Sequence, residues 1–364
     1  MARKLFVAAT GKDCGKTTVC LSLLHCAAQK YRRVGFIKPV GPKLISYQGQ
    51  VMDKDAALMC EVFQLHDQLP WLSPVAVHGH TTRDVLDGTL DPLLLHQQIL
   101  EACRQLEQQC DFIVIEGSGH AGVGSVLGCG NATVARLLQA PVMMVAEAGI
   151  GRAVDLLHMN LALFDQAEVP VHMILINKIV AEKREENLGY LQKAFSGKPL
   201  QVEGGFNFSP VLANPTLSRI SRILDVPLQG NVEERQRIIH HVQLGAASAQ
   251  RVADLLQEAT LLLVNSSRDE LMVMLASLYH LPEYRHKIAG LVIPGYAPVS
   301  PITQKIVDDS GIPYMRTTLS NSEAFARVTG DVAKISADDR EKIDLIRRLA
   351  ETELPFDAID ALIR

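Results

Sequence analysis

A glycine-rich segment near the start of the chain has the residue types that hold phosphate groups. Residues 10–18 read Thr-Gly-Lys-Asp-Cys-Gly-Lys-Thr-Thr, between an apolar run at 5–8 and an aliphatic segment of helical spacing that ends near Arg32. In a strand–loop–helix unit of this kind, backbone N–H groups and the positive end of the helix face a phosphate, and the lysine reaches its outer oxygens. The pattern predicts a phosphate-binding loop, although Thr10 stands where the common motif has its first glycine.

This loop predicts Mg²⁺·ATP as the cofactor. We expect Lys16 to act on the outer phosphates as a catalytic residue, and Thr17 to place its hydroxyl on the magnesium ion. The residues expected to contact the nucleotide are Gly11, Asp13, Cys14, Gly15, Lys16, Thr17, Thr18 and Asn177.

Two carboxylates are placed to complete a magnesium site. Glu116 follows the apolar run 112–115, and Asp55 begins the helix expected after the second buried strand. An acid at the carboxyl end of a strand faces the crevice of a doubly wound sheet, so Glu116 and Asp55 are the predicted metal ligands beside Thr17. Asp53 is the competing ligand, and either aspartate could instead cap the helix.

Two further polar residues end buried runs. Lys38 follows the run 34–37, where an ammonium group could neutralise a γ-phosphate or hold an anionic substrate, a second catalytic candidate. Asn177 follows the run 174–176, the usual place for an amide that recognises the base of a nucleotide. The structural alternatives are a solvated lysine at a strand end and an ordinary turn.

The fold class predicted is α/β. Continuous apolar runs at 112–115, 142–145 and 173–176 indicate strands covered on both faces, as in the mostly parallel, doubly wound sheet of a P-loop NTPase domain. The pattern pauses at 209–210 and a second set of apolar runs follows. We therefore predict a nucleotide-binding domain at 1–209 and a smaller α/β domain at 210–364 that includes a C-terminal helix.

Composition narrows the class of partner. A formal net charge of −4 argues against nucleic acid or an anionic membrane as partner, and leaves small molecules or proteins. The apolar stretch at the N-terminus is too short for a signal peptide or a membrane span, so a cytoplasmic location is expected. The seven cysteines form no CxxC pair, which favours free thiols in a reducing compartment.

The motifs together resemble dethiobiotin synthetase over residues 1 to about 208. The resemblance is closest to the dethiobiotin-synthetase-like domain at the N-terminus of long bacterial phosphotransacetylases, where a DRTGG domain follows. The segments that carry the first resemblance are Thr10–Thr18, Val34–Val40, Asp55–Leu58, Ile115–Gly117 and Ile176–Lys178. Ala148–Asp155 supports the likeness to the phosphotransacetylase domain. Ser267-Arg268-Asp269 and Leu291–Tyr296 stand where elements of the DRTGG domain are expected.

This resemblance implies phosphate and Mg²⁺ binding by Lys16, Thr17, Asp55 and Glu116, phosphate or substrate binding by Lys38, and base recognition by Asn177. It also suggests a homodimer. The function it favours is a nucleotide-dependent regulatory or accessory protein, whose partner is a small metabolite or an enzyme.

The alternative hypothesis is an ATP-dependent ligase of the dethiobiotin synthetase or cobyrinic acid a,c-diamide synthase type, acting on a small carboxylate or carbamate. Lys38 would then hold the anionic intermediate. The glutaminase step of the second type needs a nucleophilic cysteine, and no cysteine follows Cys129. A scaffold that no longer binds nucleotide is disfavoured by the intact Gly15-Lys16-Thr17.

Overall fold

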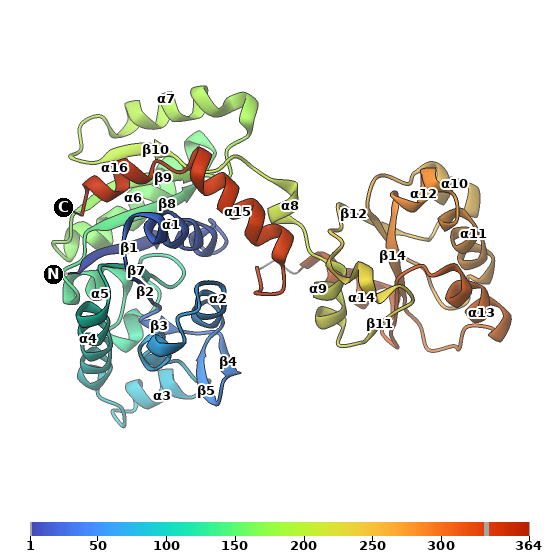
Figure 1. Cartoon of the computed structure of the whole chain (residues 1–364), viewed down its shortest axis with the longest axis horizontal. Coiled ribbons are helices and arrows are strands. Elements are labelled where there is room, and N and C mark those ends of the chain that lie inside the picture. Colours follow the sequence, from blue (N-terminus) through green and yellow to red (C-terminus); the bar gives the residue numbers. More distant parts are fainter. Residues whose placement is uncertain (1, 331–334, 364) are drawn as a thin grey trace. The chain divides into compact units, whose positions relative to one another are not determined.

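The structure is a computed structural model that describes residues 2–330 and 335–363 (Figure 1). The chain forms two compact units. The first unit comprises Met1–Phe208 together with Ser336–Arg364, and the second unit comprises Ser209–Ile335. The predicted boundary at 209–210 therefore coincides with the point where the chain leaves the first unit.

The first unit is built on a six-stranded sheet with the order β10-β9-β8-β1-β7-β2. All neighbouring strands are parallel. The strands are β1 Arg3–Ala9, β2 Val34–Ile37, β7 Phe112–Glu116, β8 Val142–Glu147, β9 Val171–Asn177 and β10 Gln201–Gly204. Because every residue of β2 and β7 is buried, these strands are covered on both faces, which confirms the α/β fold predicted from their continuous hydrophobicity.

Helices cover both faces of this sheet. One face packs on α4 (Pro92–Gln109), α5 (Asn131–Leu137), α6 (Ile150–Gln166) and α7 (Arg184–Phe195), whose apolar residues share one core with the strands. The other face carries α1 (Lys16–Lys30), which packs on β1, β2 and β7, and α2 (Lys54–Phe63) lies beside β2. The segment 78–87 contains the short helix α3 (Thr81–Leu86).

Short elements complete the first unit. Two small sheets pair β3 (Val40–Gly41) with β6 (Val75–Ala76), and β4 (Leu44–Tyr47) with β5 (Gln50–Asp53). Single turns of 3₁₀ helix lie at Ser125–Leu127 and Ala181–Lys183, and a longer one lies at His66–Trp71. Because the strands of the large sheet are parallel, the carboxyl ends of β1, β2, β7 and β9 meet at one edge of it.

The second unit has its own five-stranded sheet with the order β11-β15-β14-β13-β12. Strands β12 (His241–Leu244), β13 (Thr260–Leu263), β14 (Ile288–Ile293) and β15 (Tyr314–Arg316) are parallel, and β11 (Leu228–Gln229) runs antiparallel to β15. One face packs on α10 (Ala249–Asp254), α11 (Asp269–Tyr279) and α13 (Pro301–Ser310). The other packs on α9 (Leu217–Leu224) and α14 (Asn321–Gly330). The short helices α8 (Pro210–Ala213) and α12 (Pro282–Arg285) and the 3₁₀ turn Val232–Gln236 complete it.

The C-terminal helices correct the predicted domain range 210–364. Helix α15 (Arg340–Glu353) packs against α1, and α16 (Phe356–Ala361) follows it, so residues 336–364 belong to the first unit (Figure 1). The reason is the burial of apolar surface: Ile343, Ile346 and Ala350 are buried on α15. In sequence, the second unit is therefore inserted after the last strand of the first unit's sheet and before α15 and α16.

A buried carboxylate anchors this C-terminal segment. The side chain of Asp360 is fully buried, accepts hydrogen bonds from Arg3 Nη1 (3.2 Å) and the Tyr31 hydroxyl, and pairs with Lys30 Nζ at 2.9 Å. Burial by itself would raise the pKa of Asp360, but the Tyr31 hydroxyl and Lys30 outweigh it and hold that pKa below its ordinary value. The ionised carboxylate therefore stabilises the docked segment.

We predict that Asp360→Asn lowers the free energy of unfolding of the first unit by about 1–3 kcal/mol, because it removes the buried negative charge that pairs with Arg3 and Lys30 and turns one acceptor oxygen into a donor. Since the pKa is lowered on folding, the contribution is present above the pKa of the unfolded carboxyl, about 3.9. It is lost as the pH falls from there through the folded-state pKa.

Urea denaturation at neutral and acidic pH measures both effects. Asp357→Asn is the matched control, since the side chain of Asp357 is 97% exposed and its pair with Lys30 is long, at 3.4 Å. Equal stability of the two variants at neutral pH would contradict the anchoring role of Asp360.

Candidate functional site

The loop between β1 and α1 requires glycine at position 15. Gly15 has φ +92°, in the left-handed region, and caps the first turn of α1 with no side-chain hydrogen bond. A Cβ atom on Gly15 would lie 2.2 Å from Asn177 Nδ2, which is too close for any side chain. The turn directs the start of α1, with Lys16 and Thr17, to the carboxyl edge of the sheet, where the positive end of a helix attracts anions.

Lys16 is held inside this loop by carbonyl oxygens. Its ammonium group donates to Gly119 O at 2.7 Å and to Gly11 O at 3.1 Å, and the residue is buried. Burial lowers the pKa of Lys16 below its ordinary value, and the neighbouring charge of Lys38 adds to this. An anion at the loop would therefore supply the negative partner that the two carbonyl groups only partly replace.

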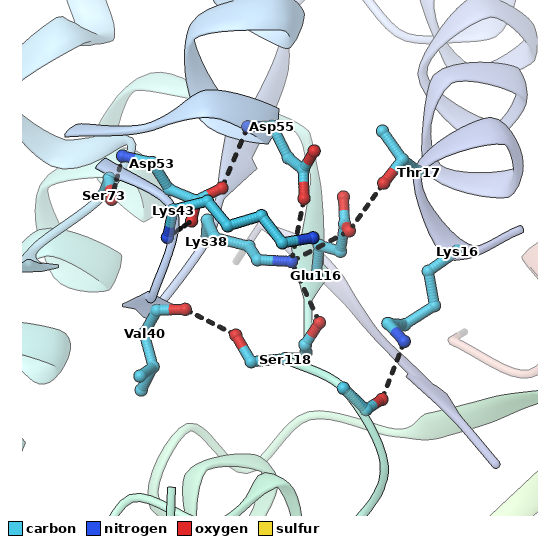
Figure 2. Close-up of polar contacts among 12 residues, drawn as sticks. Lys16, Thr17, Lys38, Val40, Lys43, Asp53, Asp55, Ser73, Glu116 and Ser118 are labelled. Atoms are coloured by element: carbon cyan, nitrogen blue, oxygen red, sulfur yellow. Dashed lines mark hydrogen bonds and ion pairs between the residues drawn. The ribbon is translucent and has the colours of Figure 1, made fainter. Parts of the chain in front are cut away.

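The four other residues predicted for phosphate, metal or substrate lie together at the ends of β2 and β7 and the starts of α1 and α2 (Figure 2). Thr17 Oγ1 donates to Glu116 Oε1 at 3.1 Å. Lys38 Nζ pairs with the same oxygen at 2.9 Å, and with Asp55 Oδ2 at 3.5 Å. Lys38 also donates to Gly117 O at 3.1 Å.

Glu116 carries a buried oxygen with no partner. Glu116 is only 1% exposed, and its Oε2 accepts no hydrogen bond from any part of the chain that the structure describes. An unpaired buried carboxylate oxygen is costly unless a cation satisfies it. Oε2 therefore fits the oxygen-ligand chemistry of a magnesium ion.

The charges at this point are strongly coupled. Burial by itself would lower the pKa of Lys38, but Glu116 and Asp55 together outweigh it and raise that pKa. Burial also raises the pKa of Glu116 above its ordinary value, since the nearby Asp55 adds to the effect and Lys38 only partly opposes it. A second cation beside Glu116 would complete its charge balance.

The donor set suits magnesium better than a metal held by protein alone. Across residues 2–330 and 335–363, no group of three or more His, Cys, Asp or Glu residues could hold a metal ion. Thr17, Asp55 and Glu116 offer one hydroxyl and two carboxylates, and magnesium usually takes one or two carboxylates with phosphate and water oxygens.

The structure separates the roles of Asp53 and Asp55. Asp53 is fully buried and caps α2: its carboxylate accepts from Asp55 N at 2.9 Å and from Lys43 N at 3.0 Å. Burial, and then the charge of Asp55, raise its pKa. Asp55, in the first turn of α2, instead faces Lys38. Of the two predicted alternatives, Asp55 is the one directed at Glu116 and Lys38, and Asp53 takes the capping role.

Asn177 has partners in the protein backbone. Its Nδ2 donates to Cys14 O at 2.9 Å, and its Oδ1 accepts from Phe206 N at 3.2 Å. The side chain thus joins the phosphate loop to the backbone at Phe206. Recognition of a base by Asn177 stays a prediction, and it would have to use the remaining N–H or lone pair of the same amide.

The remaining residues predicted to contact nucleotide lie in or next to the loop. Gly11 provides a carbonyl to Lys16, Asp13 is exposed with φ +62°, and Thr18 lies in the first turn of α1. Cys14 is buried, with its Sγ 3.5 Å from Thr10 Oγ1. All seven cysteines are buried in the structure.

Sequence reasoning missed two asparagines that position the segment after Glu116. Asn131 accepts from Ser118 N at 3.0 Å and donates to Ser118 O and His120 O. Asn160 accepts from Ala121 N at 2.8 Å and donates to Thr10 O at 3.2 Å, so it joins this segment to the phosphate loop. The available signal was an amide within the apolar face of a helix, which is buried only when it is hydrogen-bonded.

Comparisons with known proteins agree with this geometry. A family model described as "AAA domain" matches residues 3–239. The chain is 23% identical over 351 residues to the phosphate acetyltransferase of Synechocystis sp., covering 94% of this chain and 49% of that protein. It is 24% identical over 202 residues to the ATP-dependent dethiobiotin synthetase of Clostridium botulinum, covering 52% of this chain and 86% of that protein. The predicted relationship to both kinds of protein is confirmed.

The chain spans about half the length of the phosphate acetyltransferases that it matches. A solved structure of the CBS and DRTGG domains of the regulatory region of Clostridium perfringens pyrophosphatase, complexed with the activator diadenosine tetraphosphate, is similar at a TM-score of 0.26. It has 19% identity and covers 39% of this chain and 61% of that one. At this TM-score and identity, the match does not establish a shared fold or function.

Among the helices of the described residues, none has the length and apolar character needed to cross a membrane.

We predict that Gly15→Ala destabilises the first unit by about 1–3 kcal/mol, because the new Cβ meets Asn177 and φ is positive. Thermal denaturation measures this change. Gly189→Ala in α7 is the control, since a Cβ there meets nothing within 4 Å and alanine favours a helix. A melting temperature for Gly15→Ala at or above that of the unchanged protein would show that the loop tolerates a side chain.

Proposed function

The chain belongs to the AAA domain family, and from this premise we propose that its first unit binds Mg²⁺·ATP and that the protein is a nucleotide-dependent regulatory or accessory protein. The observation that carries the proposal is the unpaired, buried Oε2 of Glu116, beside the hydroxyl of Thr17 and at the end of the phosphate loop. This arrangement supplies a cation ligand at the place where a P-loop directs the outer phosphates.

Each residue of the site has a defined part in this proposal. Lys16 exchanges its carbonyl partners for the outer phosphates, and Gly15 with the start of α1 provides backbone N–H donors. Thr17, Glu116 and Asp55 hold the magnesium ion, which neutralises phosphate charge when it is bound. Lys38, which pairs with Glu116 and Asp55, would then be available to a γ-phosphate.

The regulatory reading is supported by the way the two units are joined. The second unit is inserted in the first, before the helices that cover α1, so both of its chain connections lead back to the nucleotide-binding unit. The Synechocystis relative is a phosphate acetyltransferase of about twice the matched length. A role in support of such an enzyme, with a homodimer and an enzyme or metabolite as partner, belongs to this proposal.

Lys38 favours a second candidate, an ATP-dependent ligase for a small carboxylate or carbamate. Its ammonium group is buried at the carboxyl edge of the sheet, where an anionic intermediate would meet it. In the structure this charge is already shared by Glu116 and Asp55, so the intermediate would have to displace them. Stimulation of ATP turnover by one small carboxylate would favour this candidate.

We predict that Lys16→Ala weakens ATP binding at least about tenfold, because it removes a charge-assisted contact to the phosphates. Isothermal titration calorimetry measures the dissociation constant. Lys198→Ala is the control, since Lys198 lies far along the chain and pairs only loosely with Asp165, at 3.9 Å. Unchanged affinity in Lys16→Ala would exclude the loop as the nucleotide site.

We predict that Glu116→Gln still binds ATP but loses most of the dependence of that binding on magnesium, because the amide keeps the shape and removes the charge of the metal ligand. Titration of ATP with and without Mg²⁺ measures the difference. Glu107→Gln is the control, because Glu107 lies on α4 and its carboxylate pairs with Lys4, outside the predicted site. An equal magnesium dependence in Glu116→Gln and the unchanged protein would return Glu116 to a structural role.

A further inference from the structure

The amide of Asn177 joins the phosphate loop to the segment through which the chain leaves the first unit. On one side it donates to Cys14 O, in the phosphate loop and next to Gly15. On the other side it accepts from Phe206 N, only two residues before the last residue of this part of the first unit, Phe208. Asn177 is only 3% exposed, so both bonds are shielded from water. One side chain is therefore hydrogen-bonded both to the phosphate loop and to the segment where the chain leaves the first unit.

The segment 205–208 is held by the carboxyl end of β9 and by its surroundings. Gly205 N donates to Ile176 O at 2.6 Å, Ile179 N to Phe206 O at 3.1 Å, and Phe208 N to Ile179 O at 2.7 Å. Arg184 Nη1 donates to Gly205 O and to Asn207 Oδ1, both at 2.9 Å. This segment is thus held by the end of β9, which carries Asn177, and by Ile179 and Arg184, which follow that strand.

Asn207 connects this exit segment to the C-terminal helices. Its backbone N–H donates to Glu353 Oε2 at 2.8 Å, across 146 positions of sequence. Glu353 is the last residue of α15, which packs on α1, the helix that begins at Lys16. Two residues earlier on α15, Glu351 contacts His25 and Gln29 of α1 and does not contact Asn207 in the described structure.

We propose that Asn177, the backbone of 206–207 and Glu353 form a relay that transmits the state of the phosphate loop to the point where the chain enters the second unit. Asn177 is a positioning residue in this relay. The inference rests on the proposed nucleotide binding and adds how it would be regulated or reported. A phosphate in the loop pulls the peptide groups of 13–16 toward it, and Cys14 O moves with them. Because Asn177 holds Cys14 O and Phe206 N at once, Phe206 and Asn207 respond.

The C-terminal segment returns to the first unit and contacts the exit segment there. Residues 209–335 leave the first unit at Phe208 and the chain returns at Ser336. Glu353, on the returning segment, bonds to the leaving segment at Asn207. The hydrogen bond therefore joins the segment that leaves the first unit to the segment that has returned to it.

Hydrogen–deuterium exchange on the full chain, with and without Mg²⁺·ATP, tests the relay after calorimetry has measured ATP binding. The amides of Phe206 and Asn207 donate the two bonds in question, so their exchange reports on the relay directly. We expect ATP to change their exchange rates by about fivefold or more, and to change exchange in 209–216 as well. Asn177→Ala should abolish the change at 206–207.

Glu353→Ala separates the relay from the nucleotide site. It should leave ATP affinity unchanged and retain the ATP effect at Phe206, but remove the effect in 209–216. Glu351→Ala on the same helix is the matched control and should retain both effects. Glu353→Gln keeps an acceptor oxygen and should restore the effect in 209–216, which a general loosening of α15 would not allow.

The outcomes distinguish the two proposals. Absence of ATP binding in calorimetry overturns both the proposed function and the relay. ATP binding with unchanged exchange at 206–207 overturns the relay alone. Loss of the effect in 209–216 in Glu351→Ala to the same extent as in Glu353→Ala also overturns it, because the docking of α15 as a whole would then be responsible.

Discussion

The buried ion pair between Lys38 and Glu116 is the constraint on which the site depends. It joins the ends of β2 and β7, two strands that lie side by side, at an oxygen-to-nitrogen distance of 2.9 Å. Two charges at this depth are tolerated only because they satisfy each other and are further bonded, Glu116 by Thr17 and Lys38 by Asp55 and Gly117. The same pair occupies only Oε1, and Oε2 of Glu116 is buried without a hydrogen-bond partner among the described residues.

A second constraint is the burial of α1. This helix carries Lys16 and Thr17 at its first turn, and its position relative to the sheet decides where they point. One side of α1 packs on β1 and β7, and the other is covered by α15, which arrives from the end of the chain. Helix α16, which follows α15, is held in the same unit by the carboxylate of Asp360. This carboxylate pairs with Arg3 and Lys30 and accepts a hydrogen bond from the Tyr31 hydroxyl. The nucleotide-binding unit is therefore incomplete without the C-terminal residues.

Local pattern was sufficient for the sheet of the first unit and for most of the site. The apolar runs ending at Ile37, Ile115 and Ile176 are strands buried on both faces, and the polar residue after each lies at the carboxyl edge, because parallel strands share that edge. The choice between Asp53 and Asp55 was not available to pattern, since both precede or begin the same helix. In the folded chain Asp53 accepts hydrogen bonds from the backbone N–H groups of Lys43 and Asp55 and so caps α2, while Asp55 faces Lys38.

The sequence by itself determined the phosphate loop, the α/β class, the residues gathered at the sheet edge and the boundary near 209, because each depends on residue types within a short window. Only the tertiary structure decided that Asn177 bonds to Cys14, 163 positions away, and that Glu353 bonds to Asn207, 146 positions away. The packing of α15 on α1 is also seen only in the tertiary structure. Such pairings depend on which buried surfaces are left uncovered once the sheet has formed, and no local spacing of residues records that.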